Sequence, residues 1–364
     1  MGHHCNSVVS FCFFIISFLI TVIHTEADKM VPALFIFGDS LVDVGNNNYI
    51  LSVLKANYPH NGIDFTDHKA TGRYTNGKNA ADFIVEKLGL LTLPPYLSLV
   101  TASNKNTLFL GGVNFASGGA GILDHTKLLF ASISLDEQID YYSMVYGELV
   151  KQLGADATQK LLSKSIFGIV IGSNDMLGYI RSSSTLPRNT TLPQLVDLMI
   201  STLPGQLKRI YNLGARKFAF IGMGPIGCTP SQRSLNKTGE CNEEINYWSH
   251  TFNERVKALL EEMKSENNDM NYSFFDAYSQ LLDFIQNPDA YGFSEVKAAC
   301  CGLGNLRGGA PCLPISLYCS NRSDHVFWDF YHPTEAAYRI IADNVFEGSQ
   351  PYAYPINVKQ LAAL

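Results

Sequence analysis

Short apolar runs, separated by long segments with helical periodicity, constrain the fold of this chain more than any other feature. Four runs have the length of buried strands, and three of them end at or beside a glycine: 33–37, 165–171, 217–222 and 272–275. Apolar residues at helical spacing predict helices at 79–88, 135–153, 192–213, 242–264 and 333–346. This alternation is typical of an α/β fold with a mostly parallel sheet that is covered by helices on both faces.

The chain is predicted to form one such domain over residues 28–364. Its 364 residues would suffice for two domains, but no fixed-period repeat or low-complexity linker divides them. Residues 109–121 are too rich in glycine for a helix and predict a short strand that enters a loop. In sheets of this kind, functional groups gather beyond the carboxyl ends of the strands.

The N-terminal segment differs from the rest of the chain. Residues 8–23 are almost unbroken in apolar character, and polar residues follow at 24–27. The run is short for a membrane span and fits the core of a secretory signal peptide over 1–27. Residues 1–7 contain no lysine or arginine, so an uncleaved anchor is the alternative. We predict a secreted, extracellular protein.

Cysteine use agrees with secretion. Of eight cysteines, Cys5 and Cys12 would leave with the signal peptide, and six remain: Cys228, Cys241, Cys300, Cys301, Cys312 and Cys319. An even number in a secreted chain indicates disulfides, and six cysteines allow 15 pairings. Sequence alone singles out only Cys228–Cys241, as a natural local pair. A zinc site in the 300–319 cluster is the rival interpretation, but adjacent cysteines do not match the usual ligand spacing.

The sequence predicts a glycosylated surface that does not bind nucleic acid. Four N-x-S/T sequons follow the signal segment, at Asn189, Asn236, Asn271 and Asn321. The net charge is −6, and no basic stripe is present that could neutralise phosphates.

Two glycine-rich segments resemble nucleotide sites and are interpreted as structural turns. Residues 72–79 nearly form a phosphate-binding loop, but Asn79 stands where Ser or Thr would hold magnesium, so a turn into a helix is expected. Residues 222–227 match the spacing of a dinucleotide fingerprint. Prolines within and after this segment argue against the helix start that such a site requires.

A serine, a histidine and an aspartate are candidates for nucleophilic catalysis. Ser40 follows the first strand and a glycine, so its hydroxyl can stand above the sheet; the alternative is an ordinary helix cap. A hydroxyl needs a base, and His332 is the best candidate. Asp329, three residues earlier, can reach one imidazole nitrogen while the other faces the serine. Spacing alone does not show that these groups meet.

Two further residues are candidates for stabilising an oxyanion. Asn174 follows the second strand and could extend its amide over the same sheet edge, and Gly118 could offer a backbone N–H. The alternatives are a turn residue and a flexible loop glycine.

Seven sequence blocks, taken together, resemble the plant GDSL esterase/lipase family of the SGNH hydrolase superfamily. They occur in family order and cover most of residues 32–346: FIFGDSLVDVGNNN (35–48), TGRYTNGKNAADFI (71–84), LPPYL (93–97), GGVNFASGGAGIL (111–123), IGSND (171–175), GMGPIGC (222–228) and VFWDFYHPTEAA (326–337). The resemblance implies a three-layer α/β/α sandwich of flavodoxin-like type. It also implies Ser40 as nucleophile, His332 as base, Asp329 as the orienting acid, and an oxyanion hole of the Ser40 N–H, Gly118 and Asn174.

The resemblance implies hydrolysis of acyl esters or lipids through an acyl-enzyme, with no metal or organic cofactor. Transfer of the same acyl group to an alcohol is one alternative, and a catalytically silent binding protein is the other. The oligomeric state is not predicted.

Overall fold

The computed structural model describes residues 29–100, 109–126, 131–181, 186, 187 and 189–364. The predicted signal segment lies outside these residues. Within the described part of the chain, no helix combines the length and the apolar character needed to cross a membrane.

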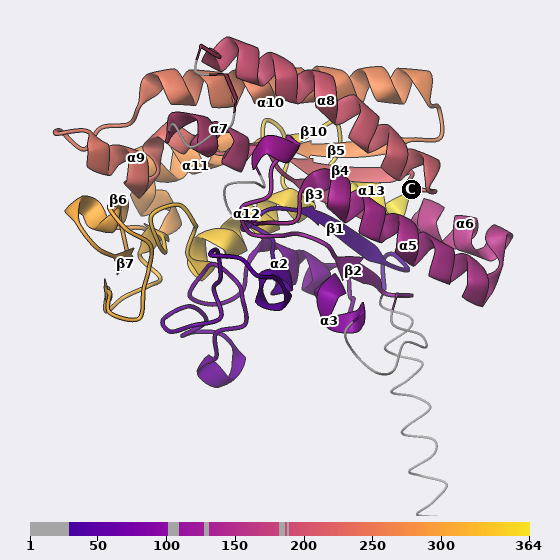
Figure 1. The fold of residues 1–364 in the computed structure, drawn as a ribbon, viewed down its shortest axis with the longest axis horizontal. Helices are drawn as coiled ribbons and strands as arrows, with labels where there is room; N and C mark the ends of the chain where they lie inside the picture. Colours follow the sequence, from indigo (N-terminus) through magenta and orange to yellow (C-terminus); the bar gives the residue numbers. More distant parts are fainter. Residues whose placement is uncertain (1–28, 101–108, 127–130, 182–185, 188) are drawn as a thin grey trace, which may run out of the picture.

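A six-stranded, mostly parallel sheet forms the centre of the molecule (Figure 1). Its strands are β1 (Leu34–Gly38), β2 (Gly112–Asn114), β3 (Ile166–Val170), β4 (Lys217–Ile221), β5 (Asn271–Phe275) and β10 (Ala353–Tyr354). Their order is β10-β5-β4-β3-β1-β2, and only β10 runs antiparallel to its neighbour. The order β2-β1-β3-β4-β5 is the flavodoxin-like arrangement, whose topological switch point lies between β1 and β3. The predicted fold class is therefore confirmed.

Helices cover both faces of this sheet. One layer contains α5 (Leu135–Leu153), α8 (Leu192–Asn212) and α10 (Glu243–Glu266), which Figure 1 shows along one side of the strands. The other contains α2 (Ala80–Lys87), α11 (Ala277–Gln286), α12 (Glu335–Glu347) and α13 (Val358–Ala363). The shorter helices are α3 (Tyr96–Val100), α6 (Ala155–Lys164), α7 (Ser173–Ile180) and α9 (Pro230–Leu235). Short 3₁₀ turns lie at Asn46–Tyr49, Thr66–His68, Ile226–Cys228, Pro288–Tyr291 and Asn305–Arg307.

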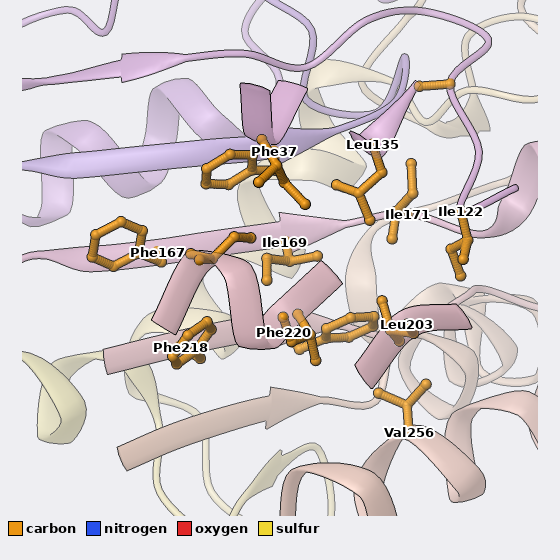
Figure 2. Close-up of a cluster of buried hydrophobic side chains, with 14 of the residues drawn as sticks. Phe37, Ile122, Leu135, Phe167, Ile169, Ile171, Leu203, Phe218, Phe220 and Val256 are labelled. Atoms are coloured by element: carbon orange, nitrogen blue, oxygen red, sulfur yellow. The ribbon is translucent and has the colours of Figure 1, made fainter. Parts of the chain in front are cut away.

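The larger core lies between the sheet and the α5–α8–α10 layer (Figure 2). Alternate residues of β1, β3 and β4 point into it, and most are aromatic: Phe35, Phe37, Phe167, Phe218 and Phe220. Phe35 stacks on Phe167 with ring centroids 5.1 Å apart. Large side chains on this face exclude water and supply most of the apolar burial.

Side-chain caps set where several helices begin. Asn79 and Ser134 each form a capping box with an acidic residue three positions later. The expected helix at 333–346 starts two residues late, because the Thr334 side chain accepts from the Ala337 N–H and so becomes the N-cap. Pro333 therefore precedes the helix and is not part of its first turn.

A small disulfide-bonded lobe follows α11. It contains β6 (Glu295–Ala299) paired with β9 (His325–Phe327), and β7 (Cys301–Gly302) paired with β8 (Leu317–Tyr318). The disulfides join Cys300 to Cys319 and Cys301 to Cys312, and the local pair Cys228–Cys241 is confirmed. Since these sulfurs are bonded to one another, they are not free to ligate the zinc ion of the rival interpretation.

Both glycine-rich segments are structural turns. Residues 72–79 lead into α2, as predicted. In the turn after β4, Asn253 on α10 accepts from the Met223 N–H and donates to the Met223 carbonyl. The expectation that no helix starts cleanly here is wrong: α9 begins at Pro230, because proline lacks the N–H that the first turn leaves unpaired.

Candidate active site

The loop after β1, residues 39–45, carries the predicted nucleophile Ser40 and is named the nucleophile loop. It leaves β1 through a close backbone contact. A Cβ at Gly38 would lie 2.4 Å from the Val170 carbonyl oxygen, so only glycine allows β1 and β3 to approach this closely. Gln138, fully buried on α5, accepts from the Gly38 N–H at 2.8 Å and donates to the Gly38 carbonyl at 2.9 Å. The two contacts hold the backbone just before Ser40.

Ser40, His332 and Asp329 form a continuous hydrogen-bonded chain. The Ser40 Oγ lies 2.8 Å from Nε2 of His332, although the two residues are 292 positions apart. Nδ1 of His332 lies 2.8 Å from both carboxylate oxygens of Asp329. Asp329 and His332 are buried, whereas Ser40 is partly exposed, so a substrate can reach the hydroxyl. This is the geometry that converts a serine hydroxyl into a nucleophile.

A tight turn before α12 presents the histidine. Asp329 Oδ1 accepts from the backbone N–H groups of Tyr331 and His332, at 2.9 and 2.8 Å. The turn closes where the Trp328 N–H donates to the His332 carbonyl. The imidazole also lies against the ring of Tyr74, with centroids 5.1 Å apart. Backbone and packing thus orient the ring independently of Ser40.

Of the residues expected to stabilise an oxyanion, Asn174 lines the same pocket as Ser40, whereas Gly118 does not. The Gly118 N–H donates to Asp43 Oδ2 at 2.9 Å, so this N–H is already paired, which corrects the expectation for Gly118. Gly119 lines the cavity instead, and no acceptor for its N–H, or for that of Ser40, is found among the described residues. Asn174 Nδ2 donates to the Ala120 carbonyl at 2.9 Å and retains a second N–H.

Two buried aspartates join these loops. Asp43 accepts from the N–H groups of Gly45, Asn46 and Gly118. Asp175, next to Asn174, accepts from the Ile122 and Leu123 N–H groups and from the Thr126 hydroxyl. Burial raises the pKa of each carboxyl to about 6. Asp43 thus holds the nucleophile loop against Gly118, and Asp175 holds the start of α7 against residues 122–126.

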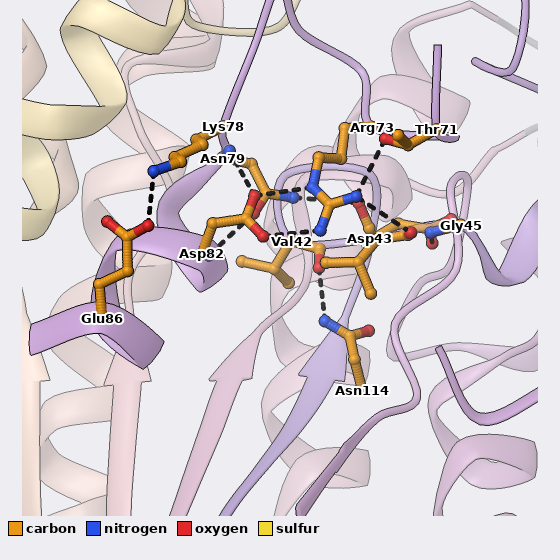
Figure 3. A network of polar contacts seen from close by, with 11 residues as sticks. Val42, Asp43, Gly45, Thr71, Arg73, Lys78, Asn79, Asp82, Glu86 and Asn114 are labelled. Atoms are coloured by element: carbon orange, nitrogen blue, oxygen red, sulfur yellow. Dashed lines mark hydrogen bonds and ion pairs between the residues drawn. The ribbon is translucent and has the colours of Figure 1, made fainter. Parts of the chain in front are cut away.

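A second polar network braces the nucleophile loop from the side of α2 (Figure 3). Asn79 donates to the Asp43 carbonyl at 3.0 Å, and Asn114 donates to the Val42 carbonyl at 2.8 Å. Arg73 forms a bidentate pair with Asp82, at 2.7 and 2.6 Å. Paired guanidinium and carboxylate groups of this kind fix orientation as well as distance.

A pocket of about 290 Å³ opens onto Ser40 and His332. The residues that line it include Asn174, Gly119, Leu54, Tyr58, Arg181, Leu313 and Phe330. The segments 93–99 and 178–192 are natural candidates for pocket walls, but among their described residues only Arg181 lines the pocket. No group of three or more His, Cys, Asp and Glu side chains within the described residues is arranged to hold a metal.

Comparison with known proteins establishes the family. The GDSL-like Lipase/Acylhydrolase family matches residues 34–345. This chain is a member of that family. GDSL esterase/lipase At5g55050 of Arabidopsis thaliana is 47% identical over 341 residues, covering 92% of this chain and 90% of that protein. GDSL esterase/lipase At4g16230 of the same plant is 43% identical, covering 93% of each. The GDSL family makes the chain a serine hydrolase of carboxylic esters.

A solved structure is also similar to this GDSL chain. It is a catalytic mutant of Axe2, an acetylxylan esterase from Geobacillus stearothermophilus, with 13% identity and a TM-score of 0.39. The match covers 86% of this chain and 91% of that one.

Several residues of the GDSL site could not be found from their motifs alone. Gln138 lies in a helix outside every family block, and its only signal is a polar residue on the buried stripe of α5. Asn46 and Asn47 lie in the first block, and their side chains donate to backbone carbonyls of the glycine-rich loop. Their role is to hold that loop, which their position in the sequence does not reveal.

Proposed function

We propose that this protein is a secreted esterase in which Ser40 carries the acyl group of the substrate. The observation that carries the proposal is the continuous contact from Ser40 through His332 to Asp329. His332 Nε2 takes the hydroxyl proton as Ser40 Oγ attacks the ester carbonyl. The same proton passes to the leaving alcohol, which leaves an acyl-enzyme that water hydrolyses to a carboxylic acid.

The oxyanion of each tetrahedral intermediate is proposed to lie between three donors. These are the N–H of Ser40, the N–H of Gly119 and the second N–H of Asn174. The cavity position of Gly119 and the unpaired state of its N–H among the described residues support this assignment over Gly118. Each such donor typically contributes a factor of about 10²–10³ in rate.

Secretion and glycosylation remain part of the proposal. Three disulfides fit an oxidising compartment. Asn189 and Asn321 are exposed, so both can carry glycans. Asn236 lies in a surface turn, where its Nδ2 donates to the Glu240 carbonyl. Asn271 suits a glycan less well, because it is the first residue of β5 in the central sheet and is only partly exposed.

The test compares hydrolysis of p-nitrophenyl butyrate by the native protein, Ser40→Ala and a control, Ser201→Ala on the exposed side of α8. The native protein and the control should turn over equally, and Ser40→Ala should fall to background. Full activity in Ser40→Ala would refute the proposal. Ester exchange that replaces hydrolysis when alcohols are added would instead assign acyl transfer. A native protein inactive on esters would favour the binding-protein alternative.

A further inference from the structure

The two faces of the sheet are filled differently. Phenylalanine rings fill the face towards α5, α8 and α10. On the other face, the row across the middle of the sheet is Ile36, Gly168 and Ala219, paired in register on β1, β3 and β4. Two of these three positions carry a single methyl group or no side chain. The opposing helices therefore face a row of the sheet that has few side-chain atoms to fill the space between the layers.

A second cavity, of about 90 Å³, lies over this row. Helices α2, α11, α12 and α13 contribute its other walls, and every lining residue is aliphatic, glycine or proline except Tyr338. At Gly168 a Cβ would meet nothing closer than Ile36 Cγ1 at 3.5 Å, so the strand has room for a side chain that it lacks. Empty cavities in proteins are apolar, and such cavities can accept small apolar ligands.

This cavity adjoins the catalytic pocket. Four residues line both spaces: Leu41, Gly224, Leu281 and Pro333. Leu41 directly follows Ser40, and Pro333 directly follows His332. Leu281 covers Gly224, because a Cβ on that glycine would lie 2.7 Å from Leu281 Cδ1. The wall at this place is thus a leucine side chain, which can change rotamer.

We propose that the cavity, which we name the sheet cavity, receives the distal end of the acyl chain of the ester substrate. This inference rests on the proposed function of Ser40. The acyl group would be bonded to Ser40 Oγ in the catalytic pocket, and its terminal carbons would pass Leu41 and Leu281 into the sheet cavity. The preferred substrates are then esters of medium-chain aliphatic acids, since acetate is too short to reach this space.

Each methylene group that leaves water for this cavity should raise kcat/KM by about fourfold. Filling the cavity with a protein side chain should remove this gain for long acyl chains and spare short ones. Ala219→Leu places three extra carbons at one end of the row, next to Gly168. Gly168→Ala adds one methyl beside it and disturbs the fold less.

The experiment measures kcat/KM on p-nitrophenyl acetate, butyrate, octanoate and decanoate, together with thermal unfolding. Ala219→Leu should lower the octanoate-to-acetate ratio at least tenfold and leave acetate within about twofold. Gly168→Ala should lower the ratio about fourfold. The control, Ala157→Leu on the exposed surface of α6, should keep the native ratio. A raised unfolding temperature with an unchanged ratio would identify the cavity as a packing void and overturn the inference.

A second readout separates this inference from the proposed function. Sodium octanoate should raise the unfolding temperature of Ser40→Ala, and this shift should be lost in the double variant Ser40→Ala, Ala219→Leu. Equal shifts in both proteins would refute the sheet cavity as an acyl site even if the native protein hydrolyses esters. If the native protein does not hydrolyse esters but the shift still depends on Ala219, only the proposed role of Ser40 is refuted, and the sheet cavity stands as an acyl site.

Discussion

Asp329→Asn tests whether Asp329 orients His332 for its proposed catalytic role. The Asp329 carboxylate receives three N–H groups: Nδ1–H of His332 and the backbone N–H groups of Tyr331 and His332. An asparagine can keep its oxygen on the two backbone groups, but its amide nitrogen then faces Nδ1. The imidazole proton would move to Nε2, which could no longer accept the proton of Ser40. We expect kcat to fall about 10⁴-fold, or roughly 5 kcal/mol.

Asp329→Ala serves as the comparison that separates catalysis from folding. It leaves two backbone N–H groups without an acceptor, and the one on buried His332 alone costs about 1–3 kcal/mol. The alanine variant should therefore unfold at a clearly lower temperature than the asparagine variant, whereas both lose activity.

The assay is steady-state hydrolysis of p-nitrophenyl butyrate, with kcat and KM determined separately and thermal unfolding measured on the same preparations. KM and the unfolding temperature of Asp329→Asn should stay close to native values. An asparagine variant that keeps a tenth or more of native kcat would refute the reasoning, because another group would then orient His332.

Three further predictions follow from the surroundings of the site. Asn174→Ala should lower kcat about 10²–10³-fold with KM little changed, as measured with p-nitrophenyl butyrate. Burial raises the pKa of Asp39 to about 7, so its contribution to stability is complete below about pH 4 and is lost as pH rises through 7. The unfolding temperature of Asp39→Asn minus that of the native protein should therefore increase as the pH is raised from 5 to 8. A difference that does not change with pH would contradict this. Replacing Cys301 and Cys312 by serine should destabilise the protein by about 2–4 kcal/mol in denaturant unfolding, since the disulfide closes a local loop.

The sequence predicted the sheet because buried parallel strands are apolar along their whole length. The runs at 33–37, 165–171 and 217–222 match β1, β3 and β4 within one residue at each end. Helices with a side-chain cap were also found, and α5 begins and ends as expected. The antiparallel strand β10 has only two residues and carries no pattern that separates it from a turn.

Motifs predict which residues gather at the site, but they do not predict the direction in which a backbone N–H points. Gly118 and Gly119 are adjacent and identical in side chain, so no pattern shows which N–H faces the pocket. The decision depends on Asp43, which accepts the first of them from 75 residues away. The sheet cavity has no sequence signal either, because small residues at Gly168 and Ala219 create a space only when the opposing helices do not fill it.

Labelling by a phosphonate tests the central claim most directly. The protein is treated with a p-nitrophenyl alkylphosphonate until esterase activity is lost, and the modified peptide is identified by mass spectrometry. Our account predicts one phosphonyl group per chain, bonded to Ser40, and no labelling of Ser40→Ala. Inactivation with the group on any other residue, or full activity with Ser40 labelled, would contradict it.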